Sequence, residues 1–500
     1  MFIVDLDREN YEYDVQALVK SFYPKEQVYV LTPATREDRR RELSGKARLK
    51  VEIGENTADL MFDGESYRYK WSENGEIPPQ WPVSERGEVL QEILARGFKD
   101  GFKRFLYDVL SQDTGKTLPW GNLTGIRPTK IAYGMLEQEK SDRFILEYYR
   151  QNHYVSMEKA DLALEIAKRE RKLLSGIHYQ GGYSLYIGIP FCPTTCLYCS
   201  FTSFPIAGYR NLVEKYIDCL IREMEFVAEA MKGKLLDSVY IGGGTPTTLE
   251  PTQLDRVLGK LKGLFDFSTV QEFTVEAGRA DSITEEKLKV LYDHGVSRIS
   301  VNPQTMNQET LDIIGRRVSV RQVEQAYALA RKAGFDNINT DLILGLPGEL
   351  EEDVKRTIDR VVSLAPDSLT VHSLAIKRAS KMSQWIQENG VSMLHNTDET
   401  MAIAAEGARR LGLVPYYLYR QKNMSGNFEN VGYAREGKFG LYNILIMEEV
   451  QTIVALGAGS ITKRVHPDGL IERCENVKEV SQYIERIDEM IGRKRVLLSD

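Results

Sequence analysis

The sequence predicts an α/β protein built on a partial (β/α)6 barrel, with an N-terminal α+β domain before it and a C-terminal domain covering it. Three observations support this. The 500 residues exceed the length of one ordinary domain. After Gly182, short apolar runs alternate with amphipathic helical segments, a pattern typical of βαβ units and a parallel sheet. Before Gly182, strand and helix patterns are mixed without that regular order.

Residues 1–180 are predicted to form the N-terminal α+β domain, whose role the sequence does not reveal. Three segments have strand character: residues 28–31, 47–53 and 67–71. Two segments carry apolar residues at helical spacing: residues 90–110 and 162–174. The glycines Gly181 and Gly182 then mark the domain boundary, because paired glycines interrupt regular structure.

Residues 181–411 are predicted to form the barrel, and residues 412–500 the domain that covers its open side. Six strand-length runs are separated by helical segments: residues 184–189, 238–241, 272–275, 298–301, 338–344 and 368–372. A closed barrel of this kind has eight such units, so six predict an open one. In these barrels the active site lies at the carboxyl ends of the strands.

Residues with distinctive chemistry fall at these carboxyl ends. Three cysteines follow the first predicted strand, and the glycine run at residues 242–244 follows the second. Glu276 follows directly on the third, Gln304 comes after the fourth, and Asp341 lies within the fifth. Since parallel strands bring their carboxyl ends to one side of a barrel, these residues are expected to converge there.

The cysteines of the segment Cys192-Pro-Thr-Thr-Cys196-Leu-Tyr-Cys199 have the spacing C-x3-C-x2-C. Five cysteines in a chain without a secretory pattern argue against a disulfide framework. Three thiolates can hold three irons of a [4Fe–4S] cluster and leave the fourth open to a substrate. A zinc ion with a fourth ligand from elsewhere is the alternative, although no histidine or cysteine closely follows Cys199.

Composition excludes some other classes. The formal net charge of -7 disfavours a nucleic-acid-binding protein, which normally presents a basic face. No apolar stretch reaches the length of a membrane span. Asp5 and the absence of a basic segment before it argue against a secretory signal. A cytoplasmic location without a membrane span is therefore expected.

The run Tyr186-Ile-Gly-Ile-Pro-Phe-Cys192, together with the next two cysteines, resembles the signature of the radical S-adenosylmethionine superfamily. Within it, residues 184–461 resemble the oxygen-independent coproporphyrinogen III oxidase family, most of all the longer coproporphyrinogen dehydrogenases of the HemZ type. The resemblance implies that the open iron chelates S-adenosylmethionine. One electron would break its S–C5′ bond, and the 5′-deoxyadenosyl radical would take hydrogen from a substrate propionate, which loses CO2 to become a vinyl group.

The resemblance also implies which residues hold the two cofactors. The [4Fe–4S] cluster would be bound by Cys192, Cys196 and Cys199. S-adenosylmethionine would be bound by Tyr186, Tyr198, Gly243, Gly244, Thr245, Glu276, Gln304, Arg316, Asp341, Ala375 and Ile461. Glycine lets the backbone approach a ligand closely, and arginine binds a carboxylate through two parallel bonds.

Alternatives remain for several of these positions. Glu276 and Asp341 could form structural ion pairs inside the barrel, and the aromatic and apolar members of the set could be core residues. The loop after Glu276 also departs from the family, because Arg279 stands where relatives often have proline.

The resemblance implies a tetrapyrrole substrate and an electron-donor protein such as a flavodoxin or ferredoxin. The expected reaction is the decarboxylation of coproporphyrinogen III to protoporphyrinogen IX. Phe201 stands where such decarboxylases often have a further cysteine and where heme-trafficking relatives have phenylalanine. A heme chaperone is therefore an alternative, although residues 426–433 lack the histidine of the chaperones' heme-ligand motif. A radical enzyme acting on another tetrapyrrole is the third possibility.

Overall fold

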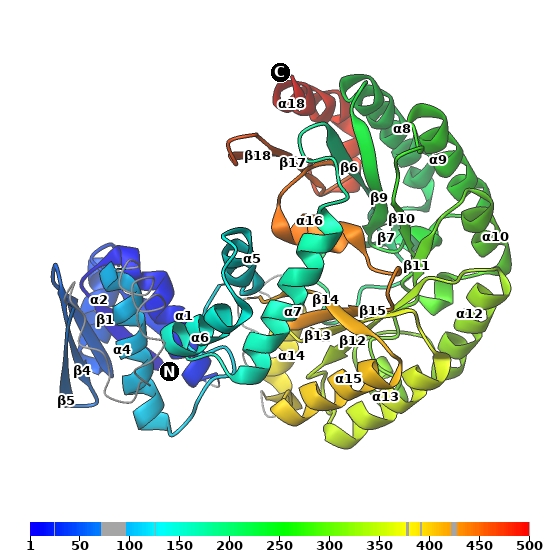
Figure 1. The fold of residues 1–500 in the computed structure, drawn as a ribbon. Helices are drawn as coiled ribbons and strands as arrows, with labels where there is room; N and C mark the ends of the chain where they lie inside the picture. The colour runs from blue at the N-terminus through cyan, green and yellow to red at the C-terminus, as the bar shows by residue number, and fades with distance from the viewer. Residues whose placement is uncertain are drawn as a thin grey trace. The chain divides into compact units, whose positions relative to one another are not determined.

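The computed structural model describes residues 1–24, 26–71, 97–125, 127–376, 380–390, 393–421 and 428–499. The chain divides into two compact units (Figure 1). The first comprises residues 1–168 and 418–429, and the second comprises residues 169–417 and 430–500. The division into three domains made above stays a prediction.

The first unit contains a five-stranded sheet in the order β2-β1-β3-β4-β5. Its strands are β1 (Phe2–Leu6), β2 (Val28–Leu31), β3 (Leu49–Ile53), β4 (Thr57–Phe62) and β5 (Glu65–Lys70). β1 runs parallel to β2 and β3, whereas β3, β4 and β5 are antiparallel. Buried and exposed residues alternate along β3, so one face of the sheet packs into the core. The three predicted strand segments are confirmed as β2, β3 and β5, while β1 and β4 were not predicted.

The helices of the first unit are α1 (Glu12–Phe22), α2 (Glu37–Leu43), α4 (Gly97–Thr114), α5 (Thr129–Glu137), α6 (Asp142–His153) and the first part of α7 (Met157–Leu174). Phe102, Leu106 and Leu110 of α4 are fully or almost fully buried at four-residue spacing, as an amphipathic helix requires. The predicted helix over residues 90–110 is confirmed from residue 97 onward, and residues 90–96 lie outside the described residues. The helix predicted over 162–174 is confirmed as the larger, C-terminal part of α7.

The second unit is built on an eleven-stranded sheet, counted over the described residues, in the order β14-β15-β13-β12-β11-β10-β9-β6-β16-β17-β18. Its first six strands in chain order are β6 (Gly182–Ile189), β9 (Leu235–Gly243), β10 (Glu272–Glu276), β11 (Arg298–Ser300), β12 (Ile338–Leu344) and β13 (Ser368–Ser373). They lie side by side in parallel. All six strands predicted from the sequence are thus confirmed.

Segments near the C-terminus extend both edges of this sheet. β16 (Thr452–Leu456) pairs in parallel with β6 and continues into β17 (Ile461–Val465) and β18 (Ile471–Glu475). On the other edge, β15 (Asn430–Ala434) pairs antiparallel with β13. β14 (Val414–Tyr419) lies next to β15 in the sheet, as its outermost strand on this side. β14 and β18 are the two edges of the sheet, so the barrel is open, as six units predict.

Helices follow the strands, and Figure 1 shows α8, α9, α10, α12 and α13 along the outer side of the curved sheet. The helices after β6 are α8 (Val213–Ala230), α9 (Pro251–Leu264), α10 (Glu285–Asp293), α11 (Gln308–Ile313), α12 (Val320–Lys332), α13 (Glu351–Leu364), α14 (Met382–Asn389), α15 (Asp398–Arg410), α16 (Leu441–Glu448), α17 (Val480–Glu485) and α18 (Ile487–Leu498). A short two-stranded ladder joins β7 (Phe191–Cys192) to β8 (Phe204–Pro205). No helix in the described ranges has the length and apolar character needed to cross a bilayer.

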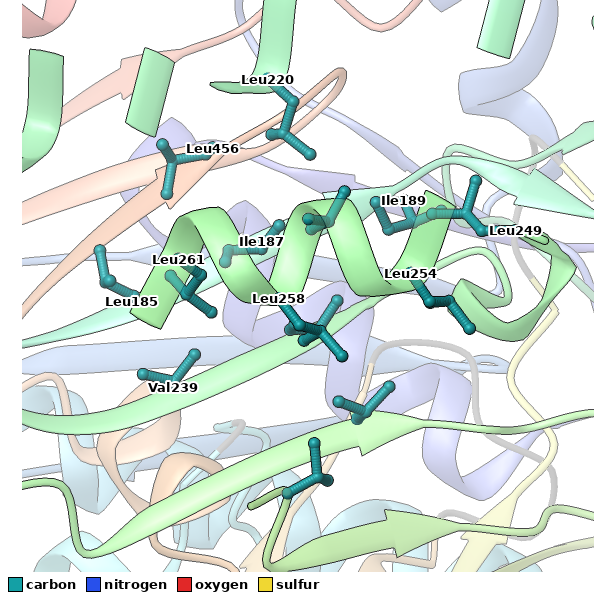
Figure 2. Packing of buried hydrophobic residues seen from close by; sticks show 14 of the residues in the cluster. Leu185, Ile187, Ile189, Leu220, Val239, Leu249, Leu254, Leu258, Leu261 and Leu456 are labelled. Atoms are coloured by element: carbon teal, nitrogen blue, oxygen red, sulfur yellow. The ribbon is translucent and has the colours of Figure 1, made fainter. Parts of the chain in front are cut away.

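The two faces of the sheet differ in chemistry because strand side chains alternate in direction. One face is apolar and packs against the helices. Figure 2 shows Leu254, Leu258 and Leu261 of α9 over the strand residues Leu185, Ile187 and Val239. Along β6, β9, β10 and β11, the residues that alternate with the apolar ones point to the opposite face. They are mostly polar or aromatic: Ser184, Tyr186, Ser238, Tyr240, Glu272, Thr274, Glu276, Arg298 and Ser300. The helix-covered face therefore forms the core, and the opposite face carries the polar and aromatic side chains that could bind ligands.

Candidate active site

The three clustered cysteines lie at the carboxyl end of β6, in and after the short strand β7. Cys192 and Cys196 are buried, and Cys199 is half-buried. The loop is held by the amide of Cys199, which donates to the carbonyl of Cys196 (3.2 Å), and by the amide of Leu197, which donates to the carbonyl of Ile314 (2.9 Å). Thr194 Oγ1 also donates to the carbonyl of Gly315 (3.1 Å). Neighbouring loops thus fix the cysteine segment.

The pKa of the Cys192 thiol depends on its burial and on the two neighbouring thiols. Burial raises the pKa of the Cys192 thiol to about 11, with smaller raising contributions from Cys199 and Cys196. A contact between Cys192 Sγ and Thr245 Oγ1 (3.4 Å) opposes this rise in pKa. Because iron binds the thiolate form, loading of a cluster here would release protons.

The thiols suit a cluster better than a single metal ion. In the described part of the chain, no three His, Cys, Asp or Glu side chains gather as a set that could hold one ion. A cube of four irons offers a different iron to each thiolate, so its ligands need not converge on a point as zinc ligands do. The C-x3-C-x2-C loop therefore fits a [4Fe–4S] cluster.

The glycine run after β9 packs directly on the start of the cysteine loop. The amide of Gly244 donates to the carbonyl of Ile189 (2.8 Å), and that of Thr245 donates to the carbonyl of Phe191 (2.7 Å). A Cβ on Gly244 would lie 2.6 Å from the carbonyl oxygen of Phe191, which no side chain allows. Gly243 has a φ of 106°, a conformation that favours glycine. The residues are glycines because the backbones approach so closely.

Glu276 ends β10 beside a stack of three tyrosine rings. Tyr240 donates to the Glu276 carboxylate (2.5 Å), and its ring lies 4.4 Å from that of Tyr442 and 6.3 Å from that of Tyr186. Burial raises the pKa of Glu276 to about 7, although the Tyr240 hydroxyl and the Gly243 amide act in the opposite direction. Glu276 could have been a ligand of S-adenosylmethionine or one half of a structural ion pair. The partner recorded for its carboxylate is a tyrosine hydroxyl and not a cation.

Gln304 and Arg316 present buried polar atoms that lack a protein partner. Gln304 Oε1 and Arg316 Nε make no hydrogen bond within the described residues. Another nitrogen of Arg316 donates to the backbone carbonyl of Asn302. Burial alone lowers the pKa of Arg316, but Tyr198 and Cys196 outweigh this and raise it. These two buried polar atoms, of which Arg316 Nε belongs to a side chain that interacts with Tyr198 and Cys196, fit a polar ligand such as the methionine end of S-adenosylmethionine.

Asp341 lies in β12 and points to the same polar face. Its carboxylate accepts from Asn339 (2.6 Å) and lies 3.9 Å from His372 Nε2. Burial raises the pKa of Asp341, but bonds and charge from His372 outweigh it, so the pKa lies below its ordinary value. The Gln304 amide donates to the Asp341 carbonyl (3.0 Å), and Gln304 itself has a φ of 71°. This strained conformation suits a residue held for function.

The predicted ligand set therefore forms one connected group at the carboxyl ends of the strands, with two members at its rim. Ala375 lies just beyond β13, and Ile461 begins β17 with 42% of its surface exposed. The sequence did not single out Tyr240 or Tyr442. Tyr240 could have been found from register, because it is the direct cross-strand partner of Tyr186.

Comparison with known proteins shows which proteins the chain resembles. Residues 186–361 match the model of the radical SAM superfamily. The chain is 39% identical over 408 residues to the oxygen-independent coproporphyrinogen-III oxidase-like protein HemZ of Bacillus subtilis (strain 168), covering 79% of this chain and 81% of that protein.

Two further relatives match over shorter stretches or at lower identity. The heme chaperone HemW of Lactococcus lactis subsp. lactis (strain IL1403) is 38% identical over 194 residues, which is 39% of this chain and 49% of that protein. The chain therefore spans about half the length of that relative. The solved structure of coproporphyrinogen III oxidase (HemN) from Escherichia coli shares the fold, with a TM-score of 0.50 and 23% identity over 64% of this chain and 73% of that one.

Proposed function

Because this chain belongs to the oxygen-independent coproporphyrinogen-III oxidase-like family of the HemZ type, within the radical SAM superfamily, we propose that it decarboxylates coproporphyrinogen III to protoporphyrinogen IX. The extent of the HemZ match carries this proposal. It covers 79% of the chain, more residues than 181–500 contain, whereas the HemW match covers 39%. The likeness therefore includes part of the region before the barrel.

The residues of the polar face have distinct roles in this proposal. Cys192, Cys196 and Cys199 bind three irons of the cluster. When bound and reduced, the cluster supplies the electron that splits S-adenosylmethionine and so starts hydrogen abstraction. Residues 243–245 hold the methionine amino group, Glu276 accepts from the ribose hydroxyls, and the orphaned atoms of Gln304 and Arg316 bind the rest of the methionine end. Tyr186, Tyr198, Asp341, Ala375 and Ile461 complete this binding surface.

The same face offers complementary surfaces for a tetrapyrrole. The rings of Tyr186, Tyr240 and Tyr442 form an aromatic surface, which suits the apolar part of such a substrate. Each conversion removes one hydrogen atom, one CO2 and one electron from a propionate and leaves a vinyl group. We further propose a cytoplasmic protein that receives its electrons from a flavodoxin or ferredoxin.

Product analysis tests the proposal. Anaerobically reconstituted protein, given dithionite, S-adenosylmethionine and coproporphyrinogen III, is expected to yield protoporphyrinogen IX, detected by mass spectrometry after oxidation. A Cys196→Ala preparation treated identically serves as the blank. S-adenosylmethionine cleavage without any loss of CO2 would contradict the decarboxylase.

A heme chaperone that keeps the cluster is the second candidate. The 38% identity to HemW favours it, and so does Phe201, a large apolar side chain that is 73% exposed two residues after the last cysteine. Titration with heme, followed by absorbance, separates the two candidates. Tight binding of one heme per chain without decarboxylation would replace the first proposal with this one.

A further inference from the structure

Arg279 joins the loop after β10 to the cysteine loop. It lies three residues beyond Glu276 and is only 3% exposed. Its Nε and Nη2 donate to the two carboxylate oxygens of Asp281 (2.9 and 2.7 Å). Its Nη1 donates to the carbonyl (3.0 Å) and the hydroxyl (2.9 Å) of Thr194 and reaches Cys196 Sγ at 3.7 Å. The planar guanidinium therefore binds Asp281 along one edge and the cysteine segment along the other.

The loop that carries Arg279 is itself fixed. Ser282 Oγ donates to the carbonyl of Arg279 (2.7 Å) and contacts Thr247 Oγ1 (2.7 Å) next to the glycine run. Arg279 is buried, with 4% of its side chain exposed, whereas Asp281 lies at the surface with 17% of its side chain exposed, so the arginine is the shielded member of the ion pair. A buried charge without partners is costly. Arg279 meets Asp281 along one edge, and along the other it meets Thr194 together with the Cys196 thiol, which is the longest of these contacts.

We propose that Arg279 is a positioning residue of the cluster: it orients Cys196 and donates a charge-assisted hydrogen bond to its sulfur, and so raises the reduction potential of the [4Fe–4S] cluster. Reduction from [4Fe–4S]2+ to [4Fe–4S]+ by an external one-electron donor adds one negative charge shared between the cube and its thiolates. A cation held in a shielded site stabilises that added charge, and hydrogen bonds to the sulfurs are a known control of cluster potentials.

The inference rests on the proposed function only in so far as the cysteines bind a cluster. Its test uses reconstituted protein without coproporphyrinogen: a redox titration of the cluster followed by electron paramagnetic resonance, with iron and sulfide content measured alongside. Failure of the inference therefore leaves the proposed decarboxylation open, and the reverse also holds.

Two variants remove the same ion pair but change the charge in opposite directions. Arg279→Gln removes the cation and is expected to shift the midpoint potential to a more negative value. Asp281→Asn keeps the arginine, removes the offsetting carboxylate and retains an amide oxygen as acceptor, so the potential is expected to rise. A purely structural role of the pair would shift both variants the same way or neither, and either result would overturn the proposal.

A control variant and a fallback keep the test decisive. Arg256→Gln removes an arginine whose partners, Glu214 and Asp218, lie on the exposed surface of α8, so it is expected to leave the potential unchanged. An equal shift in this control would overturn the assignment to Arg279. If Arg279→Gln fails to load iron, Asp281→Asn alone decides, since an unchanged or lowered potential contradicts the proposal.

Discussion

Two ion pairs hold loops at the carboxyl ends of the strands, and they differ in burial and in what the charged group is bound to. Arg279 pairs with Asp281 and extends its remaining donor to Thr194 and Cys196. Glu223 on α8 pairs with Lys494 (2.7 Å), and both side chains are fully buried. The first pair contacts a predicted cofactor ligand, whereas the second is surrounded by protein donors.

The Glu223 carboxylate fixes the loop between β16 and β17. It accepts from the amide of Gly457 (2.8 Å), from Asn476 (2.8 Å) and from Tyr483 (2.7 Å), in addition to Lys494. Gly457 has a φ of 92°, and a Cβ there would lie 2.4 Å from the carbonyl oxygen of Gly188. The loop can therefore approach β6 only because this position is glycine and its amide is bound by a buried charge.

The two ion pairs indicate how a charged group that stabilises the fold can be told apart from one that acts on the predicted cluster. Glu223 has four donors, so its charge is satisfied and its role is rigidity. Arg279 is also buried, but its ion-pair partner lies at the surface and part of its charge faces a sulfur atom, so we expect this pair to act on the cluster. A variant at Glu223 should therefore change stability, and one at Arg279 should change the cluster.

The largest expected effect comes from removing the thiol that Arg279 contacts. Cys196→Ala should abolish both the cluster's visible absorption and S-adenosylmethionine cleavage, because two thiolates cannot hold the cube in an open-iron geometry. Iron content, absorption and 5′-deoxyadenosine formation measure it.

The matched control is Cys219→Ala. Cys219 is also buried, but it lies on α8 with its sulfur 3.8 Å from the carbonyl of Ile484. This variant should keep its cluster and its cleavage activity. If Cys196→Ala kept its cluster, Cys196 would not be a cluster ligand, and the role proposed for Arg279 would be wrong.

The next largest effect is expected at the second ion pair. Glu223→Ala leaves Lys494 buried without its carboxylate and should lower the free energy of unfolding by about 3–5 kcal/mol. Urea denaturation followed by circular dichroism measures this. Glu223→Gln, which keeps an acceptor, should cost less. If folded Glu223→Gln protein showed a shifted cluster potential, the contrast between the two pairs would be wrong.

The strands of the second unit were predictable because each is a short apolar run between polar helical segments, as in residues 338–344, which match β12 fully. The strands β14 to β18 were not predicted. β16 and β15 pair with strands far away in the sequence, β16 with β6 across more than 260 residues, and local patterns carry no such information. β17 and β18 pair with neighbouring segments, and their polar sequences gave no strand pattern.

For the candidate site, too, only features that follow from local sequence order could be predicted. The cysteine spacing and the position of Glu276 after a strand were visible in the sequence, since both follow from local order. The resemblance drew attention to Arg279 but supplied no contact for its side chain. Its contact with Cys196, 83 residues away, forms only when the folded loops come together.

Glu276 offers a third kind of acidic group, half-buried and hydrogen-bonded to a tyrosine hydroxyl. Its pKa of about 7 means that the carboxyl is protonated below pH 7 and ionised above it. Because the ionised form accepts hydrogen bonds from ribose hydroxyls, S-adenosylmethionine affinity should rise about tenfold from pH 6 to pH 8. Equilibrium dialysis measures it. Glu276→Gln should lose this pH dependence, and an unaltered profile in that variant would exclude Glu276 from the ribose site.

The smallest expected effect isolates the hydroxyl that Glu276 accepts from. Tyr240→Phe removes the 2.5 Å hydrogen bond but leaves the ring in the stack, so S-adenosylmethionine affinity at pH 8 should fall by about 1 kcal/mol, or roughly fivefold. Losing that donor should also move the pH midpoint upward, since the hydroxyl favours the ionised carboxyl. Tyr442→Phe is the control, because its ring lies in the same stack and another tyrosine supplies the bond to Glu276. An equal loss in both variants would show that the change in affinity does not come from the hydrogen bond between Tyr240 and Glu276.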